Sequence, residues 1–271
     1  MSSSLDIAFT GSVAQSYERY LVPLIFEPYA VDLAQRVAQA APRRVLELAA
    51  GTGVVTRQLA VMLDASAEIV ASDLNTAMID EAQRIGTMRP VQWRQADAMK
   101  LPFDDASFDA VACQFGVMFF PDRPAAFAEV RRVLRPGGVF AFSTWGPIAT
   151  SEFAAAVSDA LAALFPQDPP QFMARTPHGY HDAALIAADL AAAGFARAPG
   201  IDTVAFTSRA VTPGVPALAF CQGTPLRGEI EARDPGGLER ATRAAEAELA
   251  RRFGQGPLEG RIEALVVTVG A

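Results

Sequence analysis

Short apolar runs alternate with amphipathic, helix-like segments through the middle of the chain. Residues 45–48 form one such run, and residues 54–63, which follow it after a turn, are amphipathic. The next helix-like segment places Met78, Ala82 and Ile85 on one face, at the i, i+4 and i+7 spacing of an α-helix. Short apolar runs between such helices are typical of the buried strands of an α/β sheet. The pattern predicts strands at residues 45–48, 68–74, 91–98, 108–115, 139–145, 201–207 and 262–269.

Three parts of the chain depart from this alternation. Residues 16–41 have a helical pattern that is interrupted by Pro23 and Pro28, because a proline ring disfavours the interior of a helix. Two later segments between predicted strands are long, and long insertions at the carboxyl end of a strand lie on the active-site side of such a sheet. The sequence therefore predicts a helical cap at residues 1–41 and a main domain at residues 42–271, with lid insertions at about 147–181 and 208–236.

The turn after the first predicted strand has the composition of a ligand site. Gly51 and Gly53 lack the Cβ atoms that would keep a ligand away from the backbone, and the following helix would point free N–H groups at the same opening. Thr56 stands where a dinucleotide-binding motif has its third glycine. Glu47 places a carboxylate beside the turn that would repel a pyrophosphate. We expect a ligand with positive charge and hydroxyl donors; an ordinary tight turn is the alternative interpretation of the glycines.

Two more acids follow the next two strands. Asp73 ends the second predicted strand, where a carboxylate can accept both hydroxyls of a ribose. Asp97 ends the third and is placed to accept a hydrogen bond from an adenine amino group. Leu74 and Met78 would enclose the adenine ring. Capping of the following helix is the alternative role for Asp73, and core packing is the alternative for the two apolar residues.

Charge and apolar content limit the partners that we expect. The net charge is −7, which argues against a nucleic-acid substrate because recognition of nucleic acid needs a basic surface. No apolar run approaches the length of a membrane span, and residues 1–6 lack the features of a secretory signal. Cys113 and Cys221 lie far apart in different settings, which favours free thiols in a reducing compartment. We therefore expect a cytoplasmic protein that acts on a small molecule.

The order of these motifs resembles the class I S-adenosylmethionine-dependent methyltransferases, in the branch that includes the ubiquinone and menaquinone C-methyltransferases. The resemblance covers about residues 42–146 and is carried by residues 47–53, 72–74, 95–98, 101–103 and 134–138. It implies a Rossmann-like, doubly wound α/β sheet of seven strands in the order 3-2-1-4-5-7-6, with the last strand antiparallel. It also implies that N-terminal helices cover the cofactor, so that Tyr17 or Tyr20 touches a ligand.

The resemblance further implies S-adenosyl-L-methionine as the cofactor and assigns ten residues to its site. They are Glu47, Ala49, Gly51, Gly53, Asp73, Leu74, Met78, Asp97, Ala98 and Gln114. Within this set, Glu47 would anchor the amino end of the methionine, Asp73 the ribose and Asp97 the adenine. Ala49 stands where the family pattern has a glycine, so the loop must take a shape that alanine allows.

The implied reaction is methyl transfer to a small aromatic or apolar organic acceptor, by O- or C-methylation. Tyr20, His178 and His181 are the candidates for a catalytic role, and loop or helix-capping roles are the alternative for the two histidines. No third ligand accompanies these histidines, so we expect no metal site. Two other hypotheses stay open: a nucleotide-binding oxidoreductase, and a methyltransferase-like protein that binds the cofactor without using it.

Overall fold

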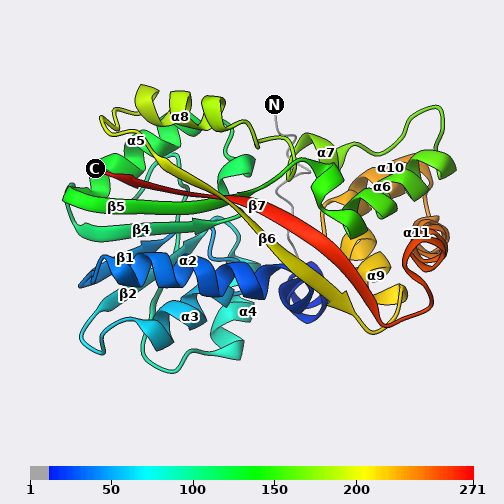
Figure 1. Cartoon of the computed structure of the whole chain (residues 1–271). Helices are drawn as coiled ribbons and strands as arrows, with labels where there is room; N and C mark the ends of the chain where they lie inside the picture. The colour runs from blue at the N-terminus through cyan, green and yellow to red at the C-terminus, as the bar shows by residue number, and fades with distance from the viewer. Residues whose placement is uncertain (1–11) are drawn as a thin grey trace.

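The computed structural model describes residues 12–271, and in that part of the chain seven strands form one mixed sheet (Figure 1). The strands are β1 Arg44–Glu47, β2 Glu68–Asp73, β3 Gln92–Gln95, β4 Phe108–Gln114, β5 Leu134–Trp145, β6 Gly200–Ala210 and β7 Leu258–Gly270. Their order is β3-β2-β1-β4-β5-β7-β6, which confirms the predicted order. The first five strands run parallel, whereas β7 pairs antiparallel with both β5 and β6.

Helices cover both faces of this sheet. The crossovers from β1 to β2 and from β4 to β5 step in opposite directions, so right-handed connections place their helices on opposite faces. Strands β1 and β4 are almost entirely buried between the two helical layers, as the short apolar runs of a parallel sheet require. The layer helices are α2 Glu27–Gln39, α3 Val54–Met62 and α4 Thr76–Ile85 on one face, and α5 Arg123–Val133 and α8 Ala183–Ala192 on the other.

A second group of helices lies at one end of β6 and β7, on the right in Figure 1. It contains α6 Glu152–Leu164, α7 Phe172–Arg175, α9 Gly214–Gln222, α10 Leu226–Arg233 and α11 Leu238–Phe253. Helix α11 packs against both α6 and α9, so segments from the two predicted insertions meet in one body. Among the described residues, no helix combines the length and the apolar content needed to cross a membrane.

The helical pattern before β1 continues through both prolines, contrary to the predicted interruptions. The elements α1 Ser12–Ser16, η1 Tyr17–Phe26 and α2 follow one another without a break. Pro28 lies in the first turn of α2, a position that proline tolerates because its fixed φ suits the start of a helix. Pro23 lies inside η1, which is a π-helix, the wider form that usually marks a functional site. Residues 1–11 of the predicted cap lie outside the described residues.

The strands near the carboxyl end are longer than the apolar pattern indicates. β6 continues to Ala210, within the range expected for the second insertion, and β7 begins at Leu258, ahead of the predicted residue 262. The two strands pair along the whole of β6. Because the partner strand supplies the hydrogen bonds, this extension does not need an apolar pattern of its own. Two short 3-10 turns complete the set: η2 Val117–Phe119 and η3 Ile148–Thr150.

Candidate functional site

The described residues enclose a cavity of about 320 Å³ at the carboxyl ends of the central strands. This edge of an open α/β sheet is where such folds bind their ligands. The π-helix η1 forms one wall, and α7 together with the loop between α9 and α10 closes another. The cavity therefore combines the strand ends with segments from three distant parts of the sequence.

The lining divides into two halves of different chemistry. The acid half lies over β1, β2 and β3 and consists of Ala49, Gly51, Asp73, Leu74, Asn75, Met78, Ala96, Asp97, Ala98 and Met99. The aromatic half lies over β4 and β5 and consists of Tyr17, Leu21, Ile25, Phe26, Gln114, Phe115, Gly116, Phe119, Phe120, Pro121, Trp145, Phe172, Met173, Pro177, Phe220, Thr224 and Pro225. Eight of the ten predicted cofactor residues line the cavity, and Glu47 and Gly53 do not.

The turn after β1 brings its backbone to the cavity by means of left-handed residues. Ala49 and Gly51 have φ angles of +50° and +55°, and alanine allows this conformation at a cost of about 1–2 kcal/mol. The Ala49 side chain points at Gly116, where an added Cβ would lie 2.6 Å from the Ala49 Cβ. Gly116 is therefore the residue that makes room for alanine at position 49.

Asp73 is fixed toward the cavity by backbone donors. Its Oδ2 accepts from the Gly51 N–H at 2.8 Å, and its Oδ1 accepts from the Asn75 N–H at 2.8 Å. The side chain is buried, and burial raises the pKa of Asp73 against the opposing effect of these donors. A carboxylate has about four acceptor sites, so each oxygen can still accept one more hydrogen bond. Asp73 is therefore held ready for a ligand with two adjacent hydroxyl groups.

The remaining acid-half residues line the same part of the cavity as Asp73. Asp97 is exposed, and its Oδ1 accepts from the Met99 N–H at 2.9 Å, which leaves its other oxygen for a ligand. Leu74 is 44% exposed, whereas Met78 is buried. No lysine or arginine lines the cavity among the described residues. This half therefore suits a neutral or cationic nucleoside better than one with a pyrophosphate.

Glu47 lies beneath the turn, and its side chain does not line the cavity. Its Oε2 accepts from the Thr56 hydroxyl at 2.5 Å, and its backbone carbonyl accepts from the Ser72 hydroxyl at 2.9 Å. The side chain is 2% exposed, and burial raises the pKa of Glu47 to about 8, although the bond from Thr56 acts in the opposite direction. The threonine that replaces the third glycine is thus the partner of this carboxyl group, which ties β1 to α3.

Gly53 serves packing and is not part of the cavity wall. It has a φ of +84° and precedes α3 as its N-cap residue. An added Cβ would lie 2.9 Å from the ring of Trp93 and 3.4 Å from the Cβ of Ala82. Glycine at this position therefore lets β3 and α4 approach the start of α3.

Aromatic rings dominate the other half of the cavity. Phe115 and Trp145, at the ends of β4 and β5, stack with centroids 3.7 Å apart and an interplanar angle of 3°. Phe26 packs on both, at 5.7 Å and 5.9 Å, and Tyr17 stacks on Phe26 at 5.0 Å. The described lining of this half includes no charged side chain. An uncharged, largely apolar molecule is therefore the occupant that this half suits.

Gln114 supplies a polar atom within the aromatic half. Its Nε2 donates to the Phe26 carbonyl at 3.3 Å, whereas its Oε1 is buried and has no hydrogen-bond partner among residues 12–271. Thr224, the other small polar residue of the lining, donates to the Phe220 carbonyl at 2.7 Å. Because a buried acceptor without a partner is costly, Gln114 Oε1 is suited to accept a hydrogen bond from a bound molecule.

The three catalytic candidates, Tyr20, His178 and His181, do not line the cavity. Tyr20 has Arg19 over its ring at 5.2 Å, and the cavity is lined instead by Tyr17. The buried His178 has its Nδ1 2.8 Å from the Gly146 carbonyl, and burial lowers its pKa to about 4. His181 is exposed, with its Nδ1 2.7 Å from the His178 carbonyl. Both histidines therefore organise the loop after β5, and the described residues contain no cluster suited to a metal ion.

Several lining residues were not predicted individually. Trp145 ends β5 on the same edge as Gln114, so the rule that located Asp73 and Asp97 also points to it. Phe172 and Phe220 lie in the two insertions, whose general position was predicted. Nothing in the local sequence separates these two from the core phenylalanines nearby, because their exposure to the cavity depends on how the insertions pack together.

Comparison with known proteins identifies the central part of the chain. Residues 46–142 match the family model described as a methyltransferase domain. Demethylmenaquinone methyltransferases of Deinococcus radiodurans and Thermus thermophilus are 41% and 44% identical to this chain. The matches cover 42% and 40% of this chain and 48% and 49% of those proteins. The chain thus spans about half the length of the curated relatives it matches.

A solved structure extends the comparison to the whole fold. Phospholethanolamine N-methyltransferase 2 of Haemonchus contortus, in complex with phosphomonomethylethanolamine and S-adenosylhomocysteine, superposes with a TM-score of 0.59 and 16% identity. The superposition covers 98% of this chain and 58% of that one. At 16% identity this likeness shows the fold alone. The similarity to methyltransferases in sequence comes from the match of residues 46–142. Residues 46–142 are therefore similar to the methyltransferase domain of the demethylmenaquinone methyltransferases, and the described part of the chain has the fold of a class I S-adenosylmethionine-dependent methyltransferase.

Proposed function

We propose that the protein transfers a methyl group from S-adenosylmethionine to a small, uncharged aromatic or apolar acceptor. The observation that carries this proposal is the division of one cavity into an acid half and an uncharged aromatic half. A cationic nucleoside fits the first, and a separate apolar molecule fits the second. The acceptor is proposed as a small molecule and not a nucleic acid, because the aromatic half is apolar and the net charge is −7. We place the protein in the cytoplasm, since Cys113 and Cys221 are buried free thiols.

The acid half has the groups that would hold the cofactor. Asp73 would accept the two ribose hydroxyls, and Asp97 would accept from the adenine amino group. Leu74 and Met78 would contact the adenine faces, and Gly51 lets the ligand approach the backbone. The absence of a cationic side chain from the described lining disfavours a dinucleotide with its pyrophosphate. Two carboxylate acceptors without a cationic side chain in the described lining favour a methyltransferase over the oxidoreductase alternative.

When bound, S-adenosylmethionine supplies an electrophilic methyl group on a sulfonium. The protein would contribute orientation, because a displacement in line with the leaving sulfur gains most from fixed geometry. The stacked Phe115 and Trp145, with Phe26 and Tyr17, would exclude water from the reacting atoms. Their electron-rich faces would also favour a cationic ligand nearby.

Among the described residues, no side chain that lines the aromatic half is suited to deprotonate an acceptor. The one ionisable side chain in the described lining of this half is Tyr17, and burial, with a further contribution from Asp73, raises the pKa of Tyr17 so that it stays protonated. An alcohol or phenol would need a base, whereas an electron-rich carbon would not. We therefore infer that the acceptor atom is nucleophilic without help from the protein, which favours C-methylation over O-methylation.

Binding and transfer assays test the proposal in two steps. Calorimetry should show that S-adenosylmethionine and S-adenosylhomocysteine both bind, and Asp73→Ala should weaken both. Asp80→Ala is the matched control, because Asp80 is exposed on α4 and lies outside the cavity lining. Transfer of a labelled methyl group should then be measured with phenols, amines and quinols, including reduced demethylmenaquinone. Absence of binding by either nucleoside at high micromolar concentration would refute the proposed function.

A further inference from the structure

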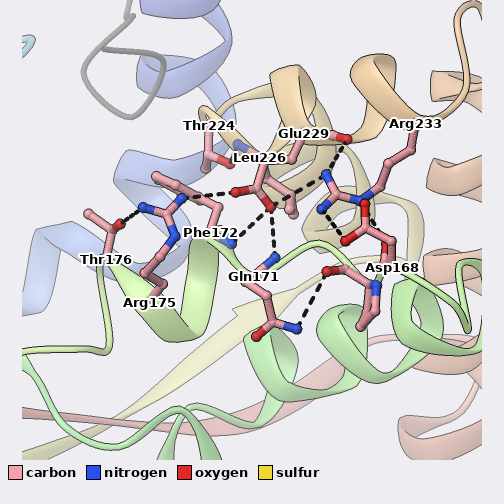
Figure 2. A network of polar contacts seen from close by, with 10 residues as sticks. Asp168, Gln171, Phe172, Arg175, Thr176, Thr224, Leu226, Glu229 and Arg233 are labelled. Atoms are coloured by element: carbon pink, nitrogen blue, oxygen red, sulfur yellow. Dashed lines mark hydrogen bonds and ion pairs between the residues drawn. The ribbon is translucent and has the colours of Figure 1, made fainter. Parts of the chain in front are cut away.

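A network of polar contacts joins the two insertions next to the aromatic half (Figure 2). It links α7 and the residues before it, which come from the first insertion, to α10, which comes from the second. Glu229 of α10 is at its centre: Oε2 accepts from the backbone N–H groups of Gln171 and Phe172 at 2.7 Å and 3.1 Å. Its Oε1 accepts from the Arg175 guanidinium at 2.9 Å. One carboxylate thus holds both the start and the end of α7.

A second arm of the network fixes Glu229 itself. Arg233 donates to the Glu229 backbone carbonyl at 2.8 Å and, through Nε, to the Asp168 carbonyl at 2.7 Å. Its Nη2 reaches Asp168 Oδ1 at 3.1 Å. The other nitrogen of Arg175 donates to the Thr176 hydroxyl at 3.2 Å. The side chains of Glu229 and Arg233 are only 17% and 20% exposed, so water competes weakly for these bonds.

The residues held in this way are cavity walls. Phe172 and Met173 line the aromatic half with 2% and 5% of their surfaces exposed, and Phe172 faces Phe119 at 6.4 Å. Thr224 and Pro225, just before α10, line the same half. The acid half has no lining residue from α7 or α10. Loss of the network would therefore move one wall of the aromatic half and leave the nucleoside site in place.

We propose that Glu229 is a positioning residue that sets the Phe172–Met173 wall and thereby determines how tightly the acceptor binds. The proposal rests on the proposed function in one respect, namely that the aromatic half holds the acceptor. Glu229 acts through the backbone of α7 and contacts neither reactant. Charged acceptors make stronger hydrogen bonds than neutral ones, and a half-satisfied network loses much of its rigidity. Removal of the charge at Glu229 should therefore release α7 without changing the size of the side chain.

The test uses Glu229→Gln and reads the two halves of the cavity separately. Calorimetry with S-adenosylhomocysteine reads the acid half. Quenching of Trp145 fluorescence by 1,4-naphthoquinone reads the aromatic half, because Trp145 lines it. All variants carry Trp93→Phe, which removes the other tryptophan of the chain, and Trp93 does not line the cavity. We expect the Kd of 1,4-naphthoquinone to rise about tenfold, which corresponds to about 1.4 kcal/mol, while the Kd of S-adenosylhomocysteine changes less than twofold.

The matched control is Glu231→Gln on the same helix. Glu231 pairs with Arg227 at 3.0 Å, is 42% exposed and makes no contact with α7 in the network, so neither Kd should change. With an acceptor that is turned over, Glu229→Gln should raise KM and leave kcat within about threefold, a separation that a general loss of folding would not produce. Arg175→Gln removes the bond to Glu229 Oε1 together with the bond to the Thr176 hydroxyl, and it leaves the two backbone N–H bonds to Glu229 Oε2 in place. It should raise the Kd of 1,4-naphthoquinone about threefold. This milder variant carries the test if Glu229→Gln does not fold.

The outcomes separate this inference from the proposed function. If S-adenosylhomocysteine does not bind the unaltered protein, the proposed function fails. If it binds but 1,4-naphthoquinone does not quench Trp145, the aromatic half does not take an apolar acceptor and the role of Glu229 falls with it. If both probes bind and the Glu229 and Arg175 variants match the control, only the inference about Glu229 is overturned.

Discussion

Replacement of Glu47 by glutamine should flatten the dependence of stability on pH. The side chain is buried without a cationic partner in hydrogen-bond contact, and its carboxyl accepts from Thr56. Burial raises the pKa of Glu47 from an ordinary value of 4.5 to about 8. Since the folded pKa exceeds the unfolded one, the folded protein binds more protons between these values, and stability falls as the pH rises through this window.

The size of the effect follows from the same two pKa values. One pKa unit corresponds to 1.36 kcal/mol, so ionisation of Glu47 destabilises the folded protein by up to about 5 kcal/mol above pH 8. About 3.5 kcal/mol of this loss in the free energy of unfolding occurs between about pH 5 and pH 8, because the folded and unfolded proteins bind different numbers of protons there. For a chain of this size, 1 kcal/mol shifts Tm by roughly 2–4 °C, so the wild-type Tm should fall about 7–14 °C further than that of Glu47→Gln.

Thermal unfolding followed by circular dichroism at intervals of pH measures this difference. Glutamine keeps an oxygen that accepts from Thr56, so the variant should remain folded. Glu81→Gln is the control: Glu81 is also buried, but its hydrogen bonds with Arg84 lower its pKa, so its removal should not flatten the fall between pH 5 and pH 8. Parallel Tm curves for the wild type and Glu47→Gln would refute the reasoning, because they would show that Glu47 is not protonated in the folded protein.

Three further substitutions probe the cavity and its surroundings. Asp73→Ala would remove the two charge-assisted bonds that we propose to the ribose and should raise the Kd of S-adenosylhomocysteine roughly a hundredfold, or about 3 kcal/mol; calorimetry with Asp80→Ala as control measures it. Gln114→Leu should lower kcat/KM about fivefold and leave the affinity for S-adenosylhomocysteine unchanged. The substitution removes the buried Oε1, which we expect to accept a hydrogen bond from the methyl acceptor. A loss of nucleoside affinity instead would assign Gln114 to the cofactor. His178→Gln should leave kcat within about twofold, since the ring contacts the Gly146 carbonyl and not the cavity; a tenfold loss of kcat at an unchanged Tm would contradict this.

The acid half could be predicted from the sequence because strand ends determine it. Asp73 ends the buried strand β2 and Asp97 follows the edge strand β3, and parallel strands bring their carboxyl ends to one edge of the sheet. Gly51 and Gly53 likewise indicated the turn after β1, because glycine takes the positive φ angles that this turn needs. The direction of a side chain could not be predicted in this way. The carboxyl of Glu47, for example, turns toward Thr56 on the next helix. That choice depends on the packing of α3, which the local pattern does not contain.

The histidines show why loop chemistry was harder to predict. His178 and His181 lie in an insertion that was expected over the site, and part of that insertion does line the cavity through Phe172 and Met173. Between α7 and α8 the chain turns so that both rings bond to backbone carbonyls, those of Gly146 and His178. Their residue type suggested proton transfer, but their position depends on tertiary packing that spacing alone does not determine.

The family match covers one half of the cavity and leaves most of the other half outside it. The matched residues 46–142 contain Asp73 and Asp97, so the sequence similarity covers most of the acid half of the cavity. Phe172 and Phe220, on the far wall, lie outside the match, as does the Glu229 network that holds that wall. Under the proposed function, the choice of acceptor would therefore depend on segments outside the family match. The acceptor has to be sought by its fit to an uncharged, aromatic half-cavity with one buried acceptor atom at Gln114, and the names of the relatives supply only the first compound to try.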